Sequence, residues 1–489
     1  MHNKTKLLIF ASLLLAACST DPMQEIPNRG DSAPEIETSD KICNTSDDAV
    51  AGSLIVKFGE EAIPSLEQNA LNAAKTRSAL TRSGIESVDD ILNDLHVTSL
   101  ERVFPEAGEH EARTRAAGLH RWYVLRFASE EDLDKAAERL AGVAEISKVQ
   151  FRTRLYRASD CKTYPFHATA GDRTRALVTA DFNDPNLFWQ WHYINNADQA
   201  VATTSVAGAD INVADAWKLT AGNPEVIVAI VDEGVKYTHP DLAANMWTNP
   251  NPSPEYNSQD IHGWNFAADG PISWGQKGDS GHGTHVAGTV AAVNNNGIGV
   301  CGVAGGTGNG DGVRLMSCQI FSGDKGGNSM TSVKAIKYAA DNGAVVLQCS
   351  WGYVSGTANS YEWGEPGFKT QEEWEKSMPL EKEALEYFIH NAGSPNGPIE
   401  GGLAIFAGGN ETAPMAGFPG AADFCISVSA TAADYTPAVY TNYGPGTTIA
   451  APGGDQDYYY EYFDDDHKRG EIGCVLSTLP YNVSESGYG

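Results

Sequence analysis

The pattern of hydrophobic and polar positions differs between two parts of the chain. Between residues 50 and 155, apolar and amphipathic segments follow the order strand, helix, strand, strand, helix, strand. The first helical stretch covers residues 61–94, and the second begins at Leu133, with Ser129 and Asp132 spaced as a capping box before it. This order is the split βαβ pattern, which predicts a ferredoxin-like α+β domain but names no function.

The rhythm changes after a loose segment, residues 156–185. From residue 186 to residue 489, short and continuously apolar runs such as "EVIVAIVD", "VVLQCSWG" and "LAIFAGGN" alternate with helical segments. Strands that are buried on both faces have such runs, because neither face meets water. We therefore expect an α/β domain with a doubly wound, mostly parallel sheet and helices on both sides.

The first residues are not expected to belong to either domain. Residues 1–17 carry two lysines followed by an apolar run that is too short to span a bilayer, which is typical of a secretion signal. The run ends in "LAAC" and resembles a bacterial lipoprotein signal, which implies lipid on Cys18. Residues 18–49 are polar and are expected to form a tether. This predicts a secreted protein of the bacterial cell envelope that meets the membrane only through a lipid anchor.

Composition narrows the classes of partner. The 63 acidic and 34 basic side chains give a formal net charge of −29, which repels phosphate backbones and argues against nucleic acid. If Cys18 of the eight cysteines carries lipid, seven remain, and an odd number cannot all pair. No zinc-type Cys/His spacing occurs. Four cysteines lie in apolar, strand-like runs and are expected to be small buried hydrophobes: Cys301, Cys318, Cys349 and Cys425.

Residues with useful chemistry follow several of the predicted strands. In doubly wound sheets, ligands bind at the carboxyl ends of the strands. Asp232 ends one run, Ser350 to Gly352 end another, and Asn410 ends a third. With His282 they make a coherent set, since a carboxylate can orient an imidazole base and an amide can stabilise an oxyanion. Each residue alone also has a simpler interpretation as a strand end, a helix cap or a turn.

The stretch "GDSGHGTHVAGTV", residues 278–290, allows three competing interpretations. Ser280 could be a nucleophile, but a helix follows it immediately, so a loop or capping role is expected. His282 and His285 could share a metal ion, but no third ligand occurs at a recognisable spacing. A third interpretation makes His282 a general base at the first turn of a helix, with His285 one turn further on.

Three segments, "VIVAIVDEGVKYTHPDL", "GHGTHVAGTVAA" and "AIFAGGNE", resemble the subtilisin-like serine proteases, over about residues 183–480. The resemblance implies that Asp232 orients the base, that His282 is the base and that Asn410 donates to the oxyanion. It also implies that Ser350, Trp351 and Gly352 pair with an extended substrate. The implied partners are protein or peptide substrates and the chain's own propeptide, residues 50–155. The implied activity is hydrolysis of peptide bonds by a serine endopeptidase, without a catalytic cofactor.

The same resemblance implies a structural calcium ion. In this family a common site takes oxygen atoms from a glutamine, an aspartate and a loop after the histidine helix. Oxygen-only ligands of this kind suit calcium. The matching positions here are Gln190, Asp241, Asn296, Ile298 and Val300.

One departure concerns the nucleophile. The family carries it in a "GTSMA"-like string after the "STLP" segment, whereas the sequence here ends "STLPYNVSESGYG". Ser484 and Ser486 lack the glycine and threonine before them and the apolar helix after them. We therefore expect a fragment that stops before the catalytic serine and is inactive as written. The alternative is a catalytically inactive relative that binds peptides or regulates a protease.

Overall fold

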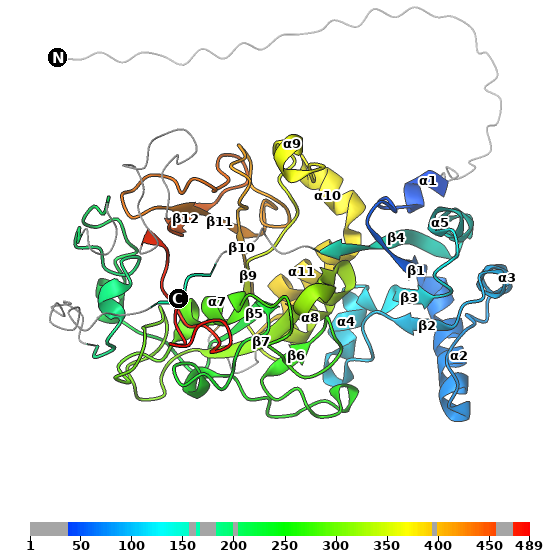
Figure 1. Cartoon of the computed structure of the whole chain (residues 1–489). Coiled ribbons are helices and arrows are strands. Elements are labelled where there is room, and N and C mark those ends of the chain that lie inside the picture. The colour runs from blue at the N-terminus through cyan, green and yellow to red at the C-terminus, as the bar shows by residue number, and fades with distance from the viewer. Residues whose placement is uncertain (1–37, 156–162, 167–181, 199–203, 394–398, 456–472) are drawn as a thin grey trace, which may run out of the picture. The chain divides into compact units, whose positions relative to one another are not determined.

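The two parts of the chain with different hydrophobic patterns form two β-sheets. A computed structural model of the chain describes residues 38–155, 163–166, 182–198, 204–393, 399–455 and 473–489 (Figure 1). Thr38–Gly489 form one compact unit, which holds a five-stranded and a seven-stranded sheet. Cys18 and the expected signal segment lie outside the described residues. Across the described ranges, no helix is both long enough and apolar enough to cross a membrane.

The smaller sheet is antiparallel, in the order β2-β3-β1-β4-β8. Its elements β1, α2, β2, β3, α5 and β4 follow one another as in a ferredoxin-like unit. Val56 of β1, Leu66 of α2 and Leu140 of α5 share one core, so the helices cover one face of this sheet. The elements of this part are α1 (Thr38–Lys41), β1 (Ala49–Phe58), α2 (Ile63–Thr76), α3 (Glu86–Asp94), β2 (Ser99–Arg102), α4 (Glu111–Ala116), β3 (Trp122–Arg126), α5 (Leu133–Ala141) and β4 (Ile146–Leu155).

Two local expectations in this part were wrong. The helical stretch expected over residues 61–94 is two helices, because α2 ends at Thr76 and its C-cap, Arg77, has a left-handed φ of 55°. Ser129 does not cap the second predicted helix. Asp132 is the N-cap of α5 and accepts the backbone N–H of Lys135 at 3.2 Å, because the helix begins at the residue after it.

The larger sheet is parallel, in the order β12-β11-β10-β9-β5-β7-β6. This confirms the predicted α/β architecture. Strand β8 (Gly327–Asn328) lies in the same part of the sequence but pairs with β4 of the smaller sheet. The remaining elements are β5 (Ile227–Glu233), α6 (Val213–Trp217), β6 (Gly263–Asn265), α7 (His282–Ala291), β7 (Arg314–Phe321), α8 (Ser329–Asp341), β9 (Val346–Cys349), α9 (Ser360–Trp363), α10 (Gln371–Ser377), α11 (Pro379–Asn391), β10 (Leu403–Ala407), β11 (Ile426–Thr431) and β12 (Ile449–Pro452).

Helices cover both faces of the larger sheet, as the side chains of the central strand β5 show. Val228 and Ile230 share a core with Ala287 of α7. The residues that alternate with them, Ala229 and Val231, belong to another core, which includes α8 and α11. Successive residues of a strand point to opposite faces, so β5 needs apolar residues at every position.

The cysteines of the apolar runs are buried thiols, as predicted. Cys301, Cys318 and Cys349 are 0% exposed, and Cys425 is 7% exposed. All four are free. Burial raises the pKa of the Cys425 thiol to about 12 and so keeps it protonated and unreactive.

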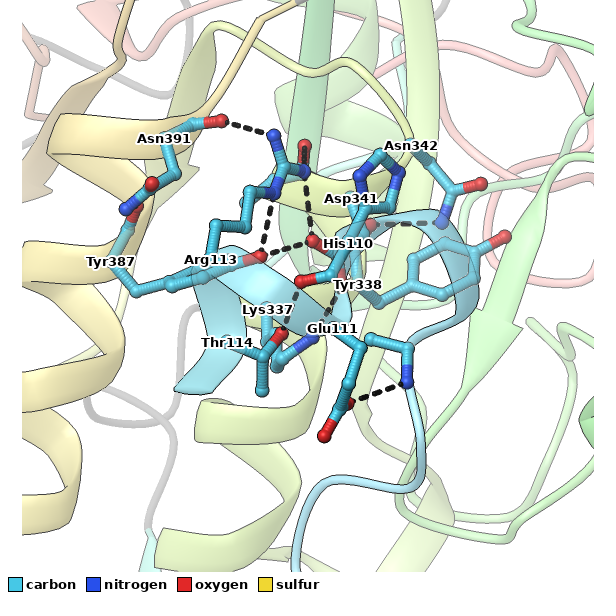
Figure 2. Close-up of polar contacts among 12 residues, drawn as sticks. His110, Glu111, Arg113, Thr114, Lys337, Tyr338, Asp341, Asn342, Tyr387 and Asn391 are labelled. Carbon is cyan, nitrogen blue, oxygen red and sulfur yellow. Dashed lines mark hydrogen bonds and ion pairs between the residues drawn. The ribbon is translucent and has the colours of Figure 1, made fainter. Parts of the chain in front are cut away.

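The first part of the chain contacts α8 and α11 through polar side chains as well as apolar ones. Figure 2 shows Arg113 of α4 between these helices. Its Nε donates to the hydroxyl of Tyr387 at 2.8 Å, its Nη2 donates to Oδ1 of Asp341 at 2.9 Å, and its Nη1 donates to the backbone oxygen of Asn391 at 2.8 Å. The Tyr387 hydroxyl itself donates to Asp341 at 2.6 Å. One arginine therefore joins α4 to both helices.

A second contact lies on α11. Glu383 accepts a hydrogen bond from Nζ of Lys57 at 2.5 Å and another from Nε1 of Trp122 at 2.8 Å. Lys57 is in β1 and Trp122 is the first residue of β3, so two strands of the smaller sheet bond to one carboxylate. Helices α8 and α11 thus present two carboxylates, Asp341 and Glu383, to the first part of the chain.

Candidate active site

Three of the predicted site segments lie at one edge of the larger sheet. Strand β9 lies between β5 and β10, and all three run parallel. Cys349 of β9 pairs with the residue before Asp232 and with Phe406 of β10, so the three strands end close to the same level. Ser350 follows Cys349 directly, and Asn410 follows β10 after two glycines. The structure therefore brings Asp232, Ser350 and Asn410 to the carboxyl edge of the sheet.

His282 and Asp232 form a hydrogen-bonded pair. The imidazole Nδ1 of His282 lies 2.8 Å from Oδ1 and 2.9 Å from Oδ2 of Asp232. Asp232 is 2% exposed, and its Oδ1 also accepts the backbone N–H of Glu233 at 2.6 Å. When Nδ1–H donates to the carboxylate, the other nitrogen of the neutral ring, Nε2, is the one that can take a proton. This is the arrangement of a general base and the carboxylate that orients it.

Helix α7 starts at His282 and lies directly against the end of β5. Its N-cap is Gly281, which has a φ of +84°, a left-handed conformation that favours glycine. A Cβ at Gly283 would lie 2.1 Å from the backbone oxygen of Glu233, so a side chain there would push the helix off the strand. The two glycines on either side of His282 therefore allow the histidine to reach Asp232.

The carboxylate of Glu233 faces the same helix end. Its Oε2 accepts the backbone N–H groups of Ser280 at 3.0 Å, Gly281 at 2.9 Å and His282 at 3.2 Å. Its Oε1 accepts the hydroxyl of Ser280 at 3.0 Å. Glu233 is 1% exposed, and sequence reasoning assigned it no role. The only signal was an acidic residue beside Asp232, because its bonding partners lie about fifty residues away in the sequence.

Ser280 and His285 are both occupied by structural contacts. The hydroxyl of Ser280 donates a hydrogen bond to Glu233, which fits a loop role better than a nucleophile. Nε2 of His285 lies 3.1 Å from the backbone oxygens of Val475 and Gly489. Burial lowers the pKa of His285 to about 4 and keeps the ring neutral. Among the described residues, no group of three or more His, Cys, Asp and Glu side chains could hold a metal ion.

Ser350–Gly352, the segment after β9, are fixed by contacts with neighbouring residues. Trp351 is 2% exposed and packs edge-on against Phe406, with ring centroids 5.3 Å apart. The hydroxyl of Ser350 accepts a hydrogen bond from Nε2 of Gln348 at 2.7 Å. A Cβ at Gly352 would lie 2.9 Å from the backbone oxygen of Phe418, so the neighbouring loop lies close to this glycine. The backbone of Ser350–Gly352 thus follows a fixed path at the sheet edge.

Asn410 is half-buried in the loop after β10, and this loop is also fixed. Oδ1 of Asn442 accepts the backbone N–H groups of Glu411 at 3.0 Å and Ala413 at 2.9 Å. Gly409, directly before Asn410, has a φ of +111°. These contacts hold the backbone on either side of Asn410 in one place.

The serines near residue 489 have backbone partners. The hydroxyl of Ser484 donates to the backbone oxygen of Tyr488 at 2.8 Å, and that of Ser486 donates to the same oxygen at 3.1 Å. Ser484 is 1% exposed. Both hydroxyls stabilise the local turn, and neither is bonded to His282.

The residues expected to bind calcium are only partly brought together. Asn296 Nδ2 donates to Oδ1 of Asp241 at 2.7 Å, and the backbone N–H of Val300 donates to Oδ2 at 2.9 Å. Gln190 instead uses its amide for the backbone of Cys301, at 2.8 Å in both directions. Ile298 donates its backbone N–H to Oδ1 of Asn296 at 2.9 Å. Burial, with a contribution from Asp184, raises the pKa of Asp241 to about 7.

Comparisons with known proteins agree on one family. The model of the subtilase family matches residues 223–486. Halolysin of Haloferax mediterranei is 30% identical over 248 residues, which are 50% of this chain and 38% of halolysin. Neuroendocrine convertase 2 of Sus scrofa is 31% identical over 219 residues, 43% of this chain and 30% of the convertase. The chain thus spans less than two fifths of the length of these relatives.

A solved structure supports the fold. Fervidolysin from Fervidobacterium pennivorans, described as a keratinolytic enzyme related to subtilisin, aligns with a TM-score of 0.51. The alignment covers 90% of this chain and 50% of fervidolysin, at 17% identity. At that identity the likeness concerns the arrangement of helices and strands alone.

Proposed function

The chain belongs to the subtilase family, and from this premise we propose that it is a serine endopeptidase whose base is His282 and whose orienting carboxylate is Asp232. The hydrogen bonds of 2.8 and 2.9 Å between them carry the proposal. In the reaction, Nε2 of His282 takes the proton of a serine hydroxyl as its oxygen attacks the peptide carbonyl. Asp232 stabilises the imidazolium that forms. The test is whether the full-length protein hydrolyses casein. Replacing either His282 or Asp232 should abolish this hydrolysis.

We do not propose Ser280, Ser484 or Ser486 as the nucleophile. Ser280 bonds to Glu233, and Ser484 and Ser486 bond to the backbone of Tyr488. A serine that attacks a carbonyl must instead be within hydrogen-bond reach of the base. The proposal therefore leaves Ser280, Ser484 and Ser486 with structural roles.

We place Asn410 at the oxyanion and Ser350–Gly352 along the substrate backbone. Ser350–Gly352 follow β9, which neighbours β5, and Asn410 follows β10, which neighbours β9. An extended peptide beside Ser350–Gly352 would bring a carbonyl toward the same sheet edge. An amide N–H from Asn410 would then stabilise the negative oxygen of the tetrahedral intermediate.

Replacing Asn410 by leucine in the full-length protein should lower kcat by about 10² to 10³ with little change in KM. This range is the loss known for an oxyanion donor of subtilisin, and the donor acts mainly in the transition state. Steady-state kinetics on a peptide substrate measure it. An unchanged kcat would remove Asn410 from the site.

We further propose that residues 50–155 act as a propeptide that docks on α8 and α11. The contacts of Arg113 with Asp341 and Tyr387 support this, as do those of Lys57 and Trp122 with Glu383. The docking surface is therefore partly electrostatic, with cations of the first part facing carboxylates of the helices.

Replacing Arg113 by alanine should destabilise the docking of this part by about 3 kcal/mol, because the loss leaves a partly buried carboxylate without one cation. Hydrogen exchange of the intact chain should then show faster exchange in β1 and β3 than in β5 and β9. The control is Arg139→Ala, since Arg139 pairs with Asp94 on the surface at 2.7 Å. Equal protection of β1 and β3 in both variants would contradict the proposed docking contact.

Calcium is proposed as a structural ion near Asp241 and Asn296. Carboxylate, amide and backbone oxygens suit this ion, and the carboxylate of Asp241 is fully buried beside Asn296. Calcium at about a hundredfold over its Kd should stabilise the fold by about 3 kcal/mol, and a chelator should remove this gain. Thermal unfolding of the wild type and of Asp241→Asn measures it, with magnesium as the control ion. Equal unfolding midpoints with and without calcium would exclude the site.

A further inference from the structure

Glu233 is an unusual residue for its surroundings. It is 1% exposed, and a carboxylate is rarely buried so completely unless it is paired or hydrogen-bonded. Its carboxylate accepts three consecutive backbone N–H groups and one hydroxyl, all from residues 280–282. These donors are the first residue of α7 and the two residues before it.

The N-cap residue of α7 makes no side-chain hydrogen bond to the helix start. The first N–H groups of a helix lack intrahelical partners and are commonly satisfied by a side chain at the N-cap. Here the N-cap is Gly281, which has no side chain to offer. The N–H of the first helical residue, His282, is instead shared between the carboxylate of Glu233 in β5, at 3.2 Å, and the hydroxyl of Ser280, at 3.3 Å.

Glu233 also reaches His282 itself. The backbone N–H of His282 donates to Glu233, while its imidazole Nδ1 bonds to Asp232. Asp232 and Glu233 are consecutive residues of β5, so one strand end holds both the backbone and the ring of the histidine. The register with β7 shifts between these two residues, which marks an irregularity where the regular ladder ends.

We propose that Glu233 is a positioning residue for the base, which fixes the first turn of α7 so that the His282 ring stays aligned with Asp232. The inference rests on the proposed peptidase function. The close approach of Gly283 to the backbone of Glu233 supports it independently, because it places the helix start directly on the strand end. Misalignment of a catalytic group by about 1 Å can lower a rate about a hundredfold.

The charge of Glu233 has a second effect. The start of a helix carries a partial positive charge, which disfavours a protonated imidazole nearby. A carboxylate at this helix end offsets that effect. Neutralising Glu233 should therefore move the acidic limb of the pH–rate profile, which reports protonation of the base, toward lower pH.

The test uses Glu233→Gln and Glu233→Asp in the full-length protein. Glu233→Gln keeps the side-chain volume and one acceptor but loses the charge. We expect kcat to fall about 10- to 100-fold with little change in KM, and the acidic limb to move down by about half a pH unit. Glu233→Asp should also lower kcat, because its shorter side chain reaches the helix less well, but it should leave the acidic limb in place.

The matched control is Asp260→Asn. Asp260 is 0% exposed and accepts hydrogen bonds from Asn249 at 2.8 Å, the backbone of Ser253 at 3.0 Å and Tyr338 at 3.2 Å. This variant also removes a buried charge that holds a loop, but it does so away from His282. A purely structural role of Glu233 would make both variants lose stability alike and keep their pH profiles. Equal kcat and equal acidic limbs in Glu233→Gln and Asp260→Asn would overturn the proposal.

A second readout does not depend on turnover. The proton between His282 Nδ1 and Asp232 should give a low-field proton NMR resonance in the wild type, identified by its loss in His282→Ala. In Glu233→Gln this resonance should weaken or shift, whereas Asp260→Asn should retain it. If the wild type does not hydrolyse casein, the peptidase proposal fails while the resonance still tests the positioning role. An unchanged resonance in folded Glu233→Gln would count against that role.

Discussion

Replacing His282 by alanine in the full-length protein should lower kcat for peptide hydrolysis by about 10⁶, the loss that removal of the base causes in subtilisin. The base acts on the chemical step, so substrate binding and thermal unfolding should change little. A fluorophosphonate probe, which labels an activated serine, should label the wild type and fail to label this variant. Steady-state kinetics and mass spectrometry of the labelled peptide measure both effects.

The matched control for this variant is His285→Ala, one helical turn further along. His285 is half-buried, and its Nε2 lies 3.1 Å from two backbone oxygens, so its loss should act on stability. We expect a lower unfolding midpoint and no comparable loss of kcat below that temperature. Similar kinetic losses in both variants, with unchanged unfolding, would contradict the assignment of His282 as the base.

The wild type decides between the two functions considered from the sequence. If the full-length protein binds extended peptides but neither hydrolyses casein nor reacts with the probe, the inactive, peptide-binding alternative is favoured. If the probe labels a serine, peptide mapping identifies it. Label on Ser484 or Ser486 would mean that the contacts of these hydroxyls with Tyr488 are not their functional ones.

The sequence predicted the larger sheet well, because its strands are buried on both faces. Continuous apolar runs report that burial directly, as Val228 to Val231 of β5 show by contributing alternately to two cores. The ends of such runs also marked Asp232, Ser350 and Asn410. Strand ends of parallel neighbours meet at one edge, so sequence order and the fold class together placed these residues.

The role of Glu233 could not be predicted in the same way. Its partners are backbone N–H groups of residues 280–282, and backbone groups leave no trace in the sequence. The bonds exist only because α7 begins close to the end of β5. Gly283 does carry a trace of this approach, but a glycine in a helix has several explanations until its neighbours are known.

The contacts of the first part of the chain with α8 and α11 could not be predicted from the sequence either. Arg113 lies in α4, a six-residue helix that the hydrophobic pattern did not predict. Short helices carry too few positions to show a period. The partners of Arg113 come from α8 and α11, which are more than two hundred residues away.

Replacing Asp232 by asparagine should lower kcat by about 10⁴, less than the loss of the base itself. Asparagine keeps the size of the side chain but can donate a hydrogen bond to Nδ1 of His282, which would leave the proton on Nε2 and so block the base. KM should change little.

The fold of Asp232→Asn should remain intact, because the backbone N–H of Glu233 can still donate to the amide oxygen as it now donates to the carboxylate. The low-field proton resonance of the pair should disappear, since it depends on a proton shared with a carboxylate. Kinetics of Asp232→Asn and His282→Ala side by side, at the same pH, measure the difference between them. If Asp232→Asn retained wild-type kcat, the 2.8 Å contact between Asp232 and His282 would be structural, and the base would need another orienting group.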